Sequence, residues 1–135
     1  MTKIHYMLDG ADFRTLEQFF DQVSAKLIPD AEWGRNLDAF NDILRGGFGT
    51  PEDGFVLEWK NSETSKTLLG YNETVRQLQL MAKHCHTANR TRMQERLELA
   101  KECIGDTVYD WLVDIIRVHC AGGRESDDGV ELELK

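Results

Sequence analysis

The sequence has little of what a membrane-spanning or secreted protein needs. Its apolar runs are only a few residues long, which is too short for a helix that crosses a bilayer. The first six residues, Met-Thr-Lys-Ile-His-Tyr, lack the charged and then apolar pattern of a secretory signal. We therefore expect a cytoplasmic protein without a membrane partner.

Positive charge is also scarce. The 135 residues include 16 lysines and arginines against 24 aspartates and glutamates, which gives a net charge of -8. A general nucleic-acid binder needs a surface that neutralises phosphates, so this balance argues against direct binding of nucleic acid. It argues in the same way against docking on anionic lipid, and it suits a basic protein partner.

Cysteine is sparse and irregularly spaced. Cys85, Cys103 and Cys120 form an odd set, which favours reduced thiols, although one disulfide with a spare thiol stays open. The stretch 84–86 is His-Cys-His, but no pair of residues has Cys-x-x-Cys or His-x-x-x-His spacing. Cys120 follows His119 directly, and adjacent residues do not face each other on a helix. We expect no metal, no cofactor and no enzymatic activity.

The chain does contain enough apolar material for one core, since 41% of its residues are hydrophobic. Its length fits a single domain over residues 1–135. Apolar residues alternate along 4–8 and 130–134, and residues 55–59 are almost continuously apolar. These three patterns predict strands, and the strand at 55–59 is apolar enough to be central.

Helical spacing fills the segments between these strands. Thr15, Asn36 and Thr107 can cap three of the predicted helices, and a shorter helix is expected from Ser62 to Leu69. Parallel strands need a crossover connection, and here helices lie between successive strands. We therefore predict an α/β fold, a three-stranded parallel sheet packed with helices.

Residues 71–105 predict an inserted helical hairpin with a break at 86–89. This segment has six lysines and arginines against four glutamates, whereas residues 1–70 and 106–135 each carry a net charge of -5. The hairpin either thickens one side of the domain or forms a second contact site. A basic face on it would come from four arginines: Arg76, Arg90, Arg92 and Arg96.

The most informative stretch runs from residue 33 to residue 44. Three of its apolar residues have the spacing of a buried helix face: Leu37, Phe40 and Leu44. Asp38 and Asp42 are four residues apart, so they stack one turn from each other on a different face.

Two interpretations of these aspartates stay open. The ordinary one is a solvated face, with Asp38 near the positive end of the helix dipole and with Arg35 and Arg45 as screening charges. The functional one is a carboxylate cluster on a rigid helix, joined by Glu32 from the preceding loop and offered to a cationic site.

The same stretch resembles the barstar family, intracellular inhibitors of a bacterial ribonuclease. The resemblance rests on the run Trp33-Gly34-Arg35-Asn36-Leu37-Asp38-Ala39-Phe40-Asn41-Asp42-Ile43-Leu44 and on the strand ending Val56-Leu57-Glu58-Trp59. It extends over residues 3–70 and 106–135, while 71–105 resembles an extension seen in larger barstar-like proteins. It implies a three-stranded parallel sheet with packed helices, no catalysis, and an acidic helix and loop that block the active site of the ribonuclease.

The resemblance also implies a partner-binding site. Asp42 matches the family's dominant carboxylate, which enters the catalytic centre of the nuclease, and Asp38 matches the acid one turn earlier. The other expected contacts are Glu32, Trp33, Asn41, Arg45 and Asp114.

Several of these positions depart from the family pattern. Glu32 replaces a contact tyrosine, Asn41 a contact tryptophan, and Arg45 a small threonine. Phe48 can supply the aromatic residue that follows the double glycine. Asp114 and Arg117 compete for the position of the acidic contact from the last helix, and the sequence does not decide between them.

Two functions follow from these observations. The first is an inhibitor of a basic ribonuclease or related nuclease, in the role of an immunity protein against a nuclease toxin. The second is a protein-interaction module on the same fold with a partner that is not a nuclease, which the replaced contacts Glu32, Asn41 and Arg45 motivate. The sequence leaves the oligomeric state unknown.

Overall fold

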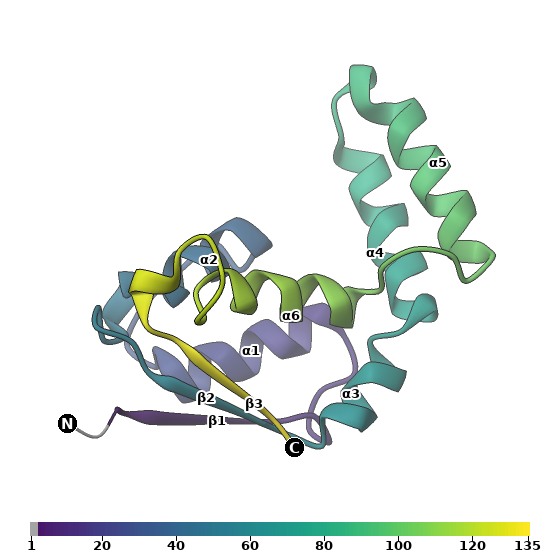
Figure 1. The fold of residues 1–135 in the computed structure, drawn as a ribbon. Coiled ribbons are helices and arrows are strands. Elements are labelled where there is room, and N and C mark those ends of the chain that lie inside the picture. Colours follow the sequence, from purple (N-terminus) through teal and green to yellow (C-terminus); the bar gives the residue numbers. More distant parts are fainter. Residues whose placement is uncertain (1–2) are drawn as a thin grey trace.

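The computed structural model of the chain describes residues 3–135, and its strands form one parallel sheet (Figure 1). The strands are β1 (His5–Asp9), β2 (Val56–Lys60) and β3 (Glu131–Leu134), in the order β1-β2-β3. The apolar segment β2 is the middle strand and pairs in parallel with both neighbours. The expected α/β fold with a three-stranded parallel sheet is confirmed.

Helices make both connections between the strands. The first connection contains α1 (Leu16–Leu27) and α2 (Leu37–Leu44). The second contains α3 (Ser62–Leu68), α4 (Tyr71–His84), α5 (Arg90–Lys101) and α6 (Val108–Val118). Short 3-10 turns lie at Gly47–Gly49, Thr87–Asn89 and Ser126–Asp128. Within residues 3–135, no helix is both long and apolar enough to cross a bilayer.

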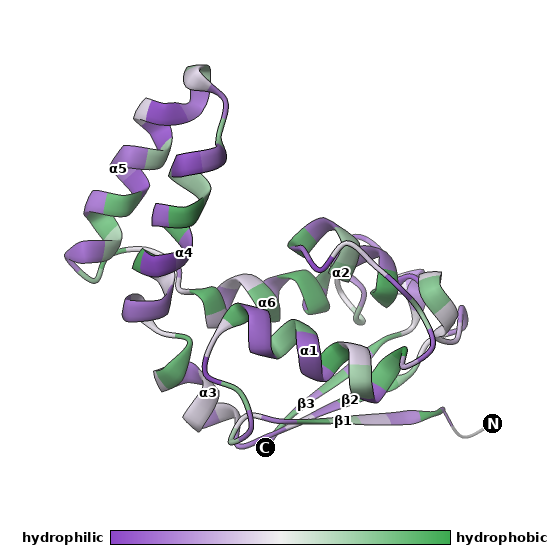
Figure 2. Cartoon of the chain, turned by 180° about the vertical axis from the view of Figure 1, so that it is seen from behind, coloured by the Kyte–Doolittle hydropathy of each residue, from purple (hydrophilic) through white to green (hydrophobic). Residues whose placement is uncertain are grey.

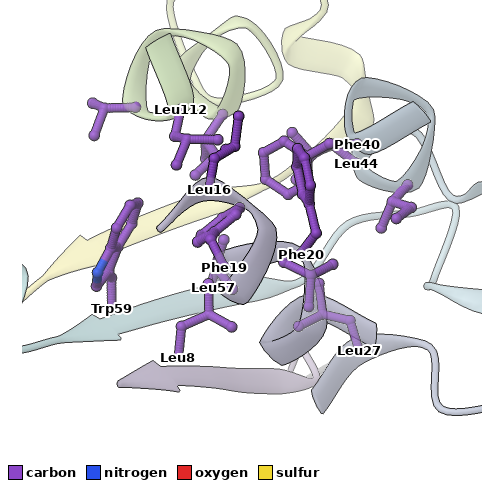
Figure 3. Close-up of a cluster of buried hydrophobic side chains, with 14 of the residues drawn as sticks. Leu8, Leu16, Phe19, Phe20, Leu27, Phe40, Leu44, Leu57, Trp59 and Leu112 are labelled. Carbon is purple, nitrogen blue, oxygen red and sulfur yellow. The ribbon is translucent and has the colours of Figure 1, made fainter. Parts of the chain in front are cut away.

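The main core lies between the sheet and the helices α1, α2 and α6, which share one side of it (Figures 1 and 3). Leu8, Leu57 and Trp59 point from the sheet towards Phe19 of α1, and Phe40 of α2 packs on Phe19. The side chains alternate between the two faces of the sheet, so Glu58 and Glu133 lie side by side on the opposite face, next to the exposed Met7. Because Phe40 belongs to the main core, this core fixes one side of α2.

The helix starts largely follow the capping residues of the sequence. Thr107 and Asp110 form a reciprocal capping box at the start of α6. At α1, Thr15 accepts a hydrogen bond from the backbone N–H of Gln18, but the Gln18 side chain accepts one from Arg14 instead of Thr15. A capping box between Thr15 and Gln18 is thus only half formed at the start of α1.

The segment 71–105 is a helical hairpin that projects away from the sheet, and hydrophilic residues dominate its outer end (Figures 1 and 2). A small second core, buried at Leu78, Leu97 and Ala100, holds α4 and α5 together. In the sequence, Ile104 continues the helical spacing of Met93, Leu97 and Ala100, yet it is exposed. The reason is that α5 ends at Lys101, so position 104 no longer continues the helical face.

A network of charged side chains ties the base of the hairpin to α1. The buried Glu73 carboxylate accepts hydrogen bonds from the backbone N–H of Leu16 (2.8 Å), from Arg76 Nε (2.6 Å) and from Gln77 Nε2 (3.0 Å). Arg76 also pairs with Glu17. Arg76, one of the four arginines that could form a basic face, is therefore engaged by two glutamates at the base of the hairpin.

Candidate functional site

Helix α2 is fixed at both ends by hydrogen bonds. The Asn36 side chain accepts a hydrogen bond from the backbone N–H of Ala39 (2.8 Å), which caps the first turn. At the other end, the buried Thr50 hydroxyl donates to the carbonyl of Ile43 (2.6 Å). With Phe40 buried beneath it, α2 is a rigid support for whatever its outer face carries.

The outer face of α2 carries the two aspartates. Asp38 is exposed, and its carboxylate has no hydrogen-bond or ion-pair partner within residues 3–135. The Asp42 side chain is 57% exposed and one oxygen lies 3.1 Å from Arg45 NH1. Arg35, considered above as a screening charge for Asp38, instead pairs with Asp21 on α1.

Arg45 joins α2 to a distant loop. Its Nε and NH2 groups donate to the two carboxylate oxygens of Glu125 at 2.9 Å and 3.0 Å, the two-pronged geometry that favours arginine with carboxylates. This hydrogen bonding raises the pKa of Arg45. No sequence pattern indicates this contact, because Glu125 lies 80 residues away in a polar stretch rich in glycine and aspartate.

Asn41 faces inward from α2. Its Oδ1 atom lies 2.6 Å from Nε2 of His119, a fully buried residue at the end of α6. Nδ1 of His119 lies 2.6 Å from Oδ2 of Asp128. Asn41 thus links α2 to α6 and to the turn at Ser126–Asp128, and its role as a partner contact stays a prediction.

The loop before α2 supplies the next two predicted residues. Glu32 is exposed beside the start of α2. Trp33 is half-buried, with its ring edge-on to Phe20 (5.3 Å between centroids) and with Nε1 donating to Ser24 Oγ at 2.6 Å. Trp33 therefore anchors the loop to α1 while part of the ring stays accessible.

Phe48 lies in the short turn that follows α2, at the C-terminal end of this helix. It is 41% exposed, which is a large share for an aromatic residue. Its backbone φ of 66° lies in the left-handed region, which residues with a Cβ rarely adopt. The flanking Gly47 and Gly49 allow the tight turn that presents this ring.

Helix α6 contributes Asp114 and Arg117, which are both exposed. They line a groove of about 750 Å³ together with Arg124 and the apolar side chains of Leu132 and Leu134. Because both residues line it, the geometry leaves open which of them takes the last-helix contact.

The only group of at least three metal-ligating side chains found within residues 3–135 is His119, Glu125 and Asp128. Their donor atoms already have partners, since Arg45 holds Glu125 and the ring of His119 faces Asn41 and Asp128. We assign no metal to this group. The three cysteines are free thiols, and burial raises the pKa of the Cys120 thiol.

Comparison with known proteins identifies the family to which this parallel α/β domain belongs. The family model described as "Barstar (barnase inhibitor)" matches residues 4–121, which is most of the chain, and the chain belongs to the barstar family. This is a family of inhibitors, which confirms the expectation that the chain is not an enzyme. A curated relative from Bacillus subtilis (strain 168), "Putative ribonuclease inhibitor YrdF", is 41% identical over 64 residues, 47% of this chain and 67% of that protein.

Proposed function

We propose that this protein inhibits a ribonuclease by covering its basic active site with α2 and the loop before it. The observation that carries the proposal is the outward presentation of Glu32, Asp38 and Asp42 on a helix and loop that are fixed from within. The matching family model, described as a barnase inhibitor, supports the same function.

The electrostatics suit such a target. A ribonuclease active site gathers cationic side chains that bind the phosphates of RNA, and carboxylates on a rigid helix can take the place of those phosphates. The net charge of -8 would also draw a basic protein towards the chain and speed its association. Asp42 is the central carboxylate of this proposal, with Asp38 one turn away.

The remaining contacts surround these carboxylates. We assign Trp33 and Asn41 to framing roles, because both are partly buried and hold their segments in place. Phe48 offers an apolar contact at the rim, and Asp114 a further charge from α6. Where the target is a toxin, the chain would act as its immunity protein.

The test is inhibition of barnase measured by cleavage of a fluorescent RNA substrate as the full chain is added. We expect inhibition to be complete at one chain per enzyme. Asp42→Ala should weaken it by about 2–5 kcal/mol, because the cations of the enzyme would then be buried without a partner. Glu95→Ala is the matched control, since it removes the same charge from an exposed position on α5, outside the proposed contact surface.

Equal inhibition by Asp42→Ala and Glu95→Ala, with both variants folded, would refute the role of Asp42. A capture experiment from the source organism tests the target itself. Recovery of a basic nuclease would support the proposal, and recovery of other proteins alone would favour the interaction module that the replaced contacts suggested.

A further inference from the structure

Arg45 places a positive charge beside the carboxylate that matters most for the proposed function. Its NH1 group lies 3.1 Å from Asp42 Oδ1, and its side chain is 44% exposed. An unopposed guanidinium at this position would neutralise Asp42 and would repel a cationic active site. The chain can therefore be an acidic inhibitor only if something else balances Arg45.

Glu125 supplies that balance. Both of its carboxylate oxygens accept hydrogen bonds from Arg45, at 2.9 Å and 3.0 Å, whereas Asp42 receives one bond from NH1. Two carboxylates thus share one guanidinium, and the group of three keeps a net negative charge. Without Glu125, Arg45 and Asp42 would form a neutral pair at the centre of the acidic face.

Glu125 is itself fixed in place. Its backbone N–H donates to the carbonyl of Val118 at the end of α6 (2.8 Å), and its side chain is only 35% exposed. Four residues further on, the carbonyl oxygen of Gly129 packs closely against Gly54, where a Cβ would lie only 2.2 Å from it. Because the backbone of Glu125 is fixed, its two hydrogen bonds hold the Arg45 guanidinium between Glu125 and Asp42.

We propose that Glu125 is a positioning residue of the inhibitory surface, which engages Arg45 and so leaves the charge of Asp42 available to the partner. This inference rests on the proposed function. It also restricts which nucleases can bind, because a cation of the enzyme opposite the C-terminal end of α2 would be repelled by Arg45. The surface fits a nuclease whose cations gather opposite Asp38 and Asp42 and do not extend beyond them.

A double-mutant cycle with barnase tests the effect on binding. Glu125→Gln keeps the shape of the side chain but removes its charge, and we expect it to weaken binding by about tenfold or more. Arg45→Ala should tighten binding, because it removes a positive charge that opposes the cations of the enzyme, and the double variant should bind as Arg45→Ala does. Equal weakening by Glu125→Gln in both backgrounds would overturn the proposal, because it would mean that Glu125 acts independently of Arg45.

A second measurement needs no partner. In the wild-type chain, the Nε–H proton of Arg45 should give a distinct NMR signal that exchanges slowly with water, and Glu125→Gln should shift it and speed its exchange. An unchanged signal in that variant would overturn the proposal even if binding changed. If the wild-type chain fails to bind barnase, the proposed function fails for that enzyme, while the Arg45 signal still decides whether Glu125 holds Arg45.

Discussion

Replacing Glu73 with alanine should destabilise the protein strongly. The Glu73 side chain is only 5% exposed and accepts hydrogen bonds from Leu16, Arg76 and Gln77. Removing one partner of a buried ion pair costs about 3–5 kcal/mol. Arg76 is 42% exposed and keeps its pair with Glu17, so we expect the lower end of that range, about 3 kcal/mol.

Urea unfolding followed by circular dichroism measures this loss. The midpoint should fall for Glu73→Ala, with little change in the slope of the transition. Glu98→Ala is the matched control: this glutamate lies on α5, its side chain is 63% exposed, and its nearest cation, Lys101, is 3.7 Å away. That control should change stability by less than about 0.5 kcal/mol. A similar small change for Glu73→Ala would refute the buried network as the anchor of the hairpin.

Two further predictions concern titratable groups. Hydrogen bonds from the side chain of Asn61 and the backbone of Ala11 lower the pKa of Asp9. The Asp9 carboxylate therefore stabilises the fold fully above its unfolded pKa of ~4, and this stabilisation disappears as pH falls through the lower folded pKa. Asp9→Asn should therefore flatten the acid limb of the urea-stability curve, and an unchanged limb would contradict this. Iodoacetamide at about pH 8 should label the exposed Cys103 well before Cys120, whose thiol pKa is raised by burial, and mass spectrometry showing equal rates would count against it.

The sequence predicted the fold well because the fold depends on local periodicity. The alternation around Leu8, the apolar run through Leu57 and the caps at Asn36 and Thr107 each report on their own element. The same local logic failed at Ile104, where the helix ended before the apolar stripe did. Periodicity predicts which face is buried only as far as the helix continues.

The candidate site could be predicted only in part. The exposure of Asp38 and Asp42 follows from helical spacing, since the opposite face of α2 is apolar. The inward turn of Asn41 towards His119 and the pairing of Arg45 with Glu125 do not follow from it. Both contacts join residues that are distant in the sequence, and a periodic pattern does not indicate which loop packs against which helix.

Mapping of backbone amide NMR shifts on addition of barnase tests whether the outer face of α2 receives the nuclease. We expect the amides of residues 32–48 and of Glu125 to shift at one equivalent of enzyme, while those of α5 stay unchanged. Shifts confined to the hairpin α4–α5, with α2 unaffected, would contradict it.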